Sequence, residues 1–107
     1  MHGMRGAKLT EMGLENYRNG KYQRAESKLR MACTLHRYMI GASQLADIYH
    51  RNLDDKIRPP EVAAHWYLIA AESGDSDVYS YLMSIDKNIM ERDDRIEIIV
   101  KYWNSFH

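Results

Sequence analysis

The stretch EVAAHWYLIAAESGDSD, residues 61–77, decides which fold this chain adopts. It places pairs of alanine on both sides of Trp66 and Tyr67 and then stops at a lone glycine, Gly74. A helix needs small residues beside large ones when neighbouring helices pack against it from two sides. No side chain in the stretch is placed as a nucleophile, a general base or a metal ligand. The stretch therefore predicts a helix built for packing rather than for catalysis.

Composition sets the broad class of the protein. A chain of 107 residues forms one domain, which buries about 65% of the surface of its unfolded state. Fifteen Lys and Arg balance fifteen Asp and Glu, so the zero net charge argues against a global electrostatic grip on nucleic acid or a membrane. The single cysteine, Cys33, excludes an internal disulfide, and neither a secretory signal nor a membrane-spanning apolar run is present. We therefore expect a cytoplasmic protein.

The spacing of apolar residues predicts six helices, because such residues recur three and four positions apart and no strand pattern competes. Asn19 and Gly20 end the first helix, and the polar loop NLDDKIRPP, residues 52–60, precedes the fourth. Pro60 suits a first helical turn, and Asp75 or Ser76 can cap the fifth helix. The expected ranges are about 7–18, 22–36, 41–51, 60–73, 77–86 and 91–106.

Two pairs of these helices share a repeated pattern. The steps of four and three residues that join Ala25, Leu29 and Ala32 recur in the fourth helix. The segment GLENYRNGKYQRAESKLRMA, residues 13–32, resembles a tetratricopeptide repeat. The segment ASQLADIYHRN, followed by AAHWYLIAAESGDSD, resembles the SEL-like variant of that repeat. The third pair keeps only Leu82, Met83 and an amphipathic pattern.

This resemblance implies an all-α fold of α-α hairpin repeats, with about three hairpins and six helices in a short right-handed solenoid. The hairpins would cover about residues 7–36, 41–73 and 77–106 of a single domain, 1–107. Proteins of this kind act as scaffolds, adaptors or chaperones rather than as enzymes.

A basic stripe is expected on the inner face of such a solenoid, because the first helix of each hairpin lines that face. Aligning the three pairs places Arg18, Arg51 and Lys87 at equivalent positions. Such a stripe suits an acidic segment or a C-terminal carboxylate of a partner protein. Alternatively, long basic side chains near helix ends only complement the helix dipole. The predicted partner-binding groove comprises Tyr17, Arg18, His50, Arg51 and Lys87.

The last helix offers a second candidate surface. In RIEIIVKYWNSFH, residues 95–107, one apolar stripe faces the preceding helices, while Ile98, Tyr102 and Phe106 lie toward another flank. An apolar flank left in water marks a contact surface, either for a second copy in a two-fold dimer or for a different protein. Alternatively, a short domain wraps this helix completely and all three residues are core.

Motifs for catalysis are missing from the sequence. There is no Gly-rich phosphate loop, no H-E-x-x-H, no cysteine pair and no G-x-S-x-G. We therefore expect no catalytic residue, no cofactor and no metal, and interpret the chain as a non-catalytic protein–protein interaction module. One alternative is a nucleic-acid-associated regulator that uses Arg5, Lys8, Arg18 and Arg51 on phosphates. Another is an enzyme subunit without chemistry of its own.

Overall fold

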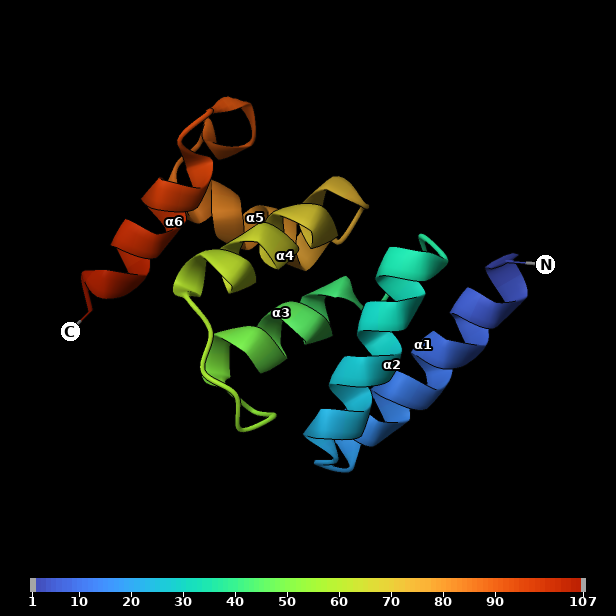
Figure 1. Cartoon of the computed structure of the whole chain (residues 1–107). Coiled ribbons are helices and arrows are strands. Elements are labelled where there is room, and N and C mark those ends of the chain that lie inside the picture. The colour runs from blue at the N-terminus through green and yellow to red at the C-terminus, as the bar shows by residue number, and fades with distance from the viewer. Residues whose placement is uncertain (1, 107) are drawn as a thin grey trace.

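The computed structural model describes residues 2–106, with side chains from residue 5 onward. The described chain is all-helical and contains no strand (Figure 1). Its elements are α1 (His2–Arg18), α2 (Tyr22–Leu35), α3 (Ala42–Arg51), α4 (Pro60–Glu72), α5 (Ser76–Ile85), the 3₁₀-helix η1 (Ile89–Glu91) and α6 (Arg95–Asn104). Within this range no helix is both long enough and apolar enough to cross a membrane.

The helices pack mainly with their neighbours along the chain. Figure 1 shows α1 beside α2 and α3 beside α4, and these two pairs make the most extensive contacts in the molecule. Helix α2 also contacts α3, so the first pair lies against the second. The third pair differs, because α6 packs against α4 as well as against α5 and η1. The C-terminal helix α6 therefore packs against α4 as well as against α5.

Small residues allow the close contacts between these helices. The four alanines of α4 that flank Trp66 and Tyr67 are all buried. Leu29 of α2 is completely buried, and a Cβ atom at Gly13 of α1 would lie only 2.7 Å from its Cδ2. A Cβ at Gly41 would lie 2.6 Å from the same atom. The two glycines therefore provide the space that Leu29 fills.

The ends of the helices follow local signals in most places. Gly20 and Gly74 adopt φ of +75° and +105° after α1 and α4, a conformation that glycine adopts without steric cost. The Asp75 side chain accepts a hydrogen bond from the Val78 amide at 3.1 Å and caps α5, as predicted.

The start of the last helix differs from the sequence-based expectation of about residue 91. Residues 89–91 form η1 instead, because the Ile89 side chain is completely buried and anchors this turn to the core. Arg92 then pairs with Asp86 at 3.4 Å and with Asp94 at 3.0 Å. Arg92, Asp86 and Asp94 therefore form ion pairs in the segment that precedes the last helix, and α6 begins at Arg95.

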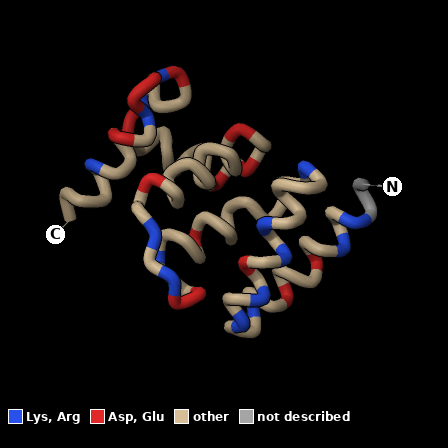
Figure 2. The backbone as a smooth tube through the Cα atoms, viewed as in Figure 1, with Lys and Arg blue, Asp and Glu red and all other residues tan. Residues whose placement is uncertain are grey.

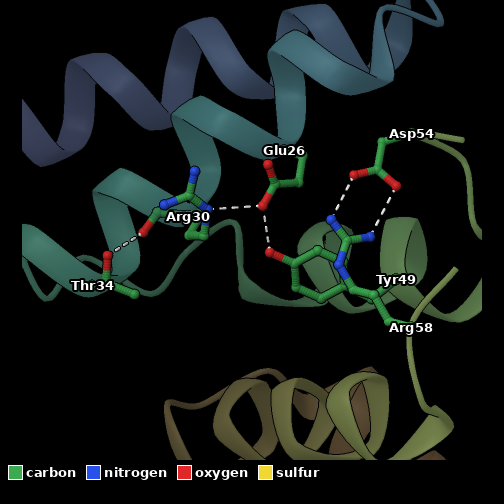
Figure 3. Close-up of polar contacts among 6 residues, drawn as sticks. All are labelled: Glu26, Arg30, Thr34, Tyr49, Asp54 and Arg58. Atoms are coloured by element: carbon green, nitrogen blue, oxygen red, sulfur yellow. Dashed lines mark hydrogen bonds and ion pairs between the residues drawn. The ribbon is translucent and has the colours of Figure 1, made fainter. Parts of the chain in front are cut away.

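A buried polar network joins the first helical pair to the second (Figure 3). The Glu26 carboxylate accepts hydrogen bonds from the Tyr49 hydroxyl at 2.5 Å and from Arg30 Nε at 2.9 Å. The Arg58 guanidinium lies 4.2 Å from the centre of the Tyr49 ring and donates to both Asp54 oxygens at 2.9 and 2.8 Å. The network thereby ties the loop after α3 to α2 and α3.

Candidate partner-binding site

Three residues from two helices form an ionic triad on the side of the molecule where α1 meets α3. Asp47 of α3 accepts a hydrogen bond from the Tyr17 hydroxyl of α1. It also accepts two hydrogen bonds from Arg51, one helical turn later, with Nε and Nη2 both at 2.7 Å. This two-pronged contact holds the guanidinium in one orientation and links α1 to α3.

The charges within the triad stabilise one another. Burial opposes ionisation of Asp47, but the hydrogen bonds from Arg51 and Tyr17 and the charge of Arg51 outweigh it and hold the pKa of the Asp47 carboxyl below its usual value. Burial and the Asp47 carboxylate both raise the pKa of the Tyr17 hydroxyl, so it remains a donor at neutral pH. The charge of the exposed Arg51 guanidinium is therefore compensated by Asp47 at the protein surface.

An aromatic cluster of four residues, His50, Tyr67, Tyr81 and Trp103, lies beside the triad. The His50 ring stacks on the Trp103 indole with ring centres 4.0 Å apart and planes at 22°. Tyr67 meets both rings edge-on, with centres 5.9 Å away. The Trp103 indole N–H donates to the Tyr81 hydroxyl at 2.7 Å. The cluster thereby joins α3, α4, α5 and α6 at one point.

Two titratable groups of the cluster are shifted by burial. Burial under Trp103 lowers the pKa of His50, the Asp47 carboxylate opposes this effect, and the Arg51 charge adds to it. Burial, together with the nearby Asp47 carboxylate, raises the pKa of the Tyr67 hydroxyl well above its ordinary value. His50 is therefore mostly neutral at neutral pH, and Tyr67 carries its proton.

A depression opens on one side of the aromatic cluster. It has a volume of about 260 Å³ and is lined by Tyr67, Asp77, Val78 and Tyr81. Tyr81 is itself partly exposed, although its hydroxyl is held by Trp103. The depression therefore presents aromatic ring surface that is already held in place, with one carboxylate at its edge.

The five predicted groove residues fall into two groups. Tyr17 and Arg51 meet in the triad, and His50 belongs to the aromatic cluster. Arg18, at the end of α1, and Lys87, after α5, are exposed. Among the described side chains neither of these two makes an ion pair or a hydrogen bond with the triad. Basic and acidic residues are interspersed along α1 and α2 (Figure 2).

The three predicted residues of the last helix also differ in exposure. Ile98 and Tyr102 are half-buried and pack against the hydrophobic core. Phe106 is 68% exposed, and its ring meets Tyr102 edge-on with centres 4.9 Å apart. Phe106 is therefore the member of this set that presents a large apolar surface to water.

Sequence reasoning missed Asp47, Tyr67, Tyr81 and Trp103 as members of the site. Asp47 had a local signal, because it stands four residues before Arg51 on one helix face, the spacing of an ion pair. Tyr67, Tyr81 and Trp103 had no such local signal in the sequence. Trp103 and Tyr81 are 22 positions apart, and only the packing of α6 brings them together.

The chain matches no protein-family model, no curated protein and no solved structure. The contacts described above are therefore the basis for a functional proposal.

Proposed function

We propose that this chain is a non-catalytic protein-interaction module of the tetratricopeptide and SEL-like kind, and that it works as a cytoplasmic adaptor, scaffold or small chaperone. The partner segment binds over the face that combines the ionic triad with the aromatic cluster. The observation that carries this proposal is the open depression beside Tyr67 and Tyr81, whose rings are held by neighbouring residues.

Aromatic residues with polar tips support this choice of surface. Tyrosine, tryptophan and arginine contribute most often to the binding energy at protein interfaces. Ordered rings also lose little conformational freedom on binding, and Tyr81 is already held by the Trp103 indole. The depression, at about 260 Å³, is smaller than most sites for whole cofactors or small-molecule ligands. Its size instead suits one or two side chains of a bound protein segment.

The distribution of charge refines the expected partner. Arg51 is compensated by Asp47, so it helps to shape the face more than it attracts anions. Arg18 and Lys87 are exposed and lie outside the lining of the depression, so their charge stays available to acidic groups that flank a bound anchor. A segment that combines an aromatic or aliphatic anchor with acidic flanks is the partner that this face fits best.

Site-specific photocrosslinking tests this proposal. A benzophenone amino acid replaces Tyr81 in one variant and Tyr79 in the other, in cells that naturally make the protein. Tyr79 is the matched control, because it is an exposed tyrosine on the same helix with no contact to the aromatic cluster among the described residues. We expect a discrete protein adduct from position 81 and none from position 79. An adduct with twice the mass of the chain would identify the partner as a second copy.

Equal crosslinking from both positions, or none from position 81, would contradict the proposed binding face. The replacement Tyr81→Ser gives an independent check on the wild-type partner once it has been captured. It should weaken the complex while the far-ultraviolet circular dichroism stays helical, since Tyr81 lies at the surface.

A further inference from the structure

A second groove lies between α2 and α4, away from the aromatic cluster. It consists of two adjoining depressions of about 490 and 300 Å³, both lined by Arg37 and Met39. We call it the α2–α4 groove and define it by Arg37, Met39, Ile40, Trp66, Ile69 and Gly74. The residues that line it come from the end of α2, from the turn that follows α2 and from α4 as far as Gly74 and Asp75.

Helix α4 contributes apolar side chains to this groove, and they remain partly exposed to water. Helix α4 is mostly apolar. Its polar or charged side chains are Glu61, His65 and Glu72, and its two large aromatic residues, Trp66 and Tyr67, carry one polar group each. A helix that is apolar all round is normally buried on every side. The alanines of α4 are indeed buried, but Trp66 and Ile69 are only half-buried and line the groove.

The opposite rim adds more exposed apolar surface. Ile40, in the turn that follows α2, is 63% exposed. It lines the larger depression together with Met39, which also lines the smaller one beside Trp66 and Ile69 of α4. Exposed apolar residues that surround a depression mark an interaction site more often than isolated ones do.

Arg37 gives the groove a charge at its centre. It adopts a left-handed φ of +55° after α2, and the Tyr38 amide donates back to the Ala32 carbonyl at 3.0 Å. No ion pair or hydrogen bond to its guanidinium occurs among the side chains from residue 5 to residue 106. The acidic residue at the end of the groove, Asp75, already accepts from the Val78 amide. The groove therefore combines the Arg37 guanidinium, which no carboxylate among these side chains binds, with apolar side chains and with the Asp75 carboxylate at one end.

The length of the groove limits the size of its occupant. From Trp66 to Ser73 helix α4 rises by about 10 Å, which matches two turns of a helix or about three residues of extended chain. Large apolar side chains of the occupant would cover Trp66, Met39 and Ile69. A carboxylate placed between them would meet the Arg37 guanidinium, which pairs with carboxylates in a planar, two-pronged geometry.

We propose that the α2–α4 groove binds a short acidic–apolar segment of a partner protein, in which a carboxylate is flanked by large apolar side chains. This site is separate from the face of the aromatic cluster, so one chain can hold two segments at once. The inference goes beyond the proposed function and does not depend on Tyr81.

Selection from a phage-displayed library of random dodecapeptides on the immobilised full chain tests this site. We expect enriched peptides to carry Asp or Glu within one helical turn of two large apolar residues. Synthetic copies should shift the indole N–H resonance of Trp66 and leave that of Trp103 unchanged. The two resonances are assigned with Trp66→Phe.

The variant Arg37→Gly separates a role in binding from a role in folding. Glycine accepts the left-handed backbone at this position more readily than arginine, so the variant should fold at least as well as the wild type. Its affinity for the selected peptides should fall by about tenfold or more, as expected for the loss of one charge-assisted hydrogen bond. Arg24→Ala is the charge-matched control, because Arg24 is exposed on α2 and lines neither depression, and it should retain the affinity.

Four results would overturn the inference: no enrichment, enriched peptides without acidic residues, a shift of Trp103 instead of Trp66, or an unchanged affinity in Arg37→Gly. None of them contradicts the crosslinking that is expected from position 81. The two proposals therefore succeed or fail separately.

Discussion

At the scale of single residues, burial decides which ion pairs of this chain stabilise the fold. The Asp54 side chain is 1% exposed and shares both its oxygens with Arg58. The Asp94 side chain also pairs with an arginine, Arg92, but both of those residues lie in water. An exposed pair exchanges contacts with water for similar contacts with each other, whereas a buried partner left alone loses both.

The replacement Asp54→Asn should lower the free energy of unfolding by about 2–3 kcal/mol, because Arg58 keeps its charge in a largely buried position over the Tyr49 ring. Urea denaturation would show a lower midpoint with an unchanged slope. Asp94→Asn is the control and should leave the midpoint where it is. Equal urea midpoints in Asp54→Asn and Asp94→Asn would show that burial does not make the Asp54–Arg58 pair more stabilising than the exposed pair.

The same pair should make stability depend on acid. Hydrogen bonds from Arg58, with burial opposing them and the Arg58 charge adding to them, hold the pKa of Asp54 below its usual value. Its contribution is therefore complete above the unfolded pKa of about 3.9 and is lost as the pH falls through the lower folded pKa. The difference in unfolding free energy between wild type and Asp54→Asn should stay constant above about pH 5 and shrink below about pH 4. A difference that grows on acidification would reverse this assignment.

At the scale of helices, the close packing around Leu29 of α2 depends on two glycines, which have no side chain. Gly13 and Gly41 approach Leu29 from two sides, each closely enough that a Cβ would overlap it. Helix α1 therefore keeps a residue of low helix propensity in its interior because the neighbouring helix occupies the space of a side chain.

The replacement Gly13→Ala should destabilise the protein by about 1–3 kcal/mol, although alanine is the better helix former, because the new methyl group meets Leu29 Cδ2 at 2.7 Å. Thermal or urea unfolding measures this change. In the background of Leu29→Ala, which empties the same space, Gly13→Ala should cost far less. Additive effects of the two replacements would show that Gly13 and Leu29 do not compete for space.

At the scale of the whole molecule, the stack of His50 on Trp103 joins the second helical pair to the last helix. Partial burial lowers the pKa of His50, so the unfolded chain takes up a proton more readily than the folded one. Stability should therefore fall as the pH drops below the unfolded value of about 6.5, and the loss is complete below the folded pKa. Asp47, Arg51 and Tyr67 are the charged or titratable groups that act on this ring.

Fluorescence of Trp103 in the background of Trp66→Phe can follow this titration. As the pH falls below about 6.5 we expect a lower urea midpoint and, as it falls through the lower folded pKa of His50, quenching of Trp103, since a protonated imidazole quenches an indole stacked on it. His50→Gln removes the titrating group but keeps a polar side chain of similar length. Its fluorescence should not change over this range. An unchanged pH response in His50→Gln would mean that another group is responsible.

The sequence by itself determined the elements whose causes are local. Apolar spacing predicted the helices, Gly20 and Gly74 marked two of their ends, and Asp75 was a predicted cap. The paired alanines of α4 predicted close packing, and they are buried. Each of these features depends on residues within about one or two helical turns, so a short window of sequence contains its physical cause.

Only the tertiary structure decided which distant residues meet. It brought Tyr17 to Asp47, set Trp103 on His50 and left Trp66 beside an open groove. It also moved the start of α6 to Arg95, because the burial of Ile89 formed a separate turn first. Such contacts depend on how helices cross, and a crossing is chosen by the shape of the whole packed core rather than by the residues on either side of it along the chain.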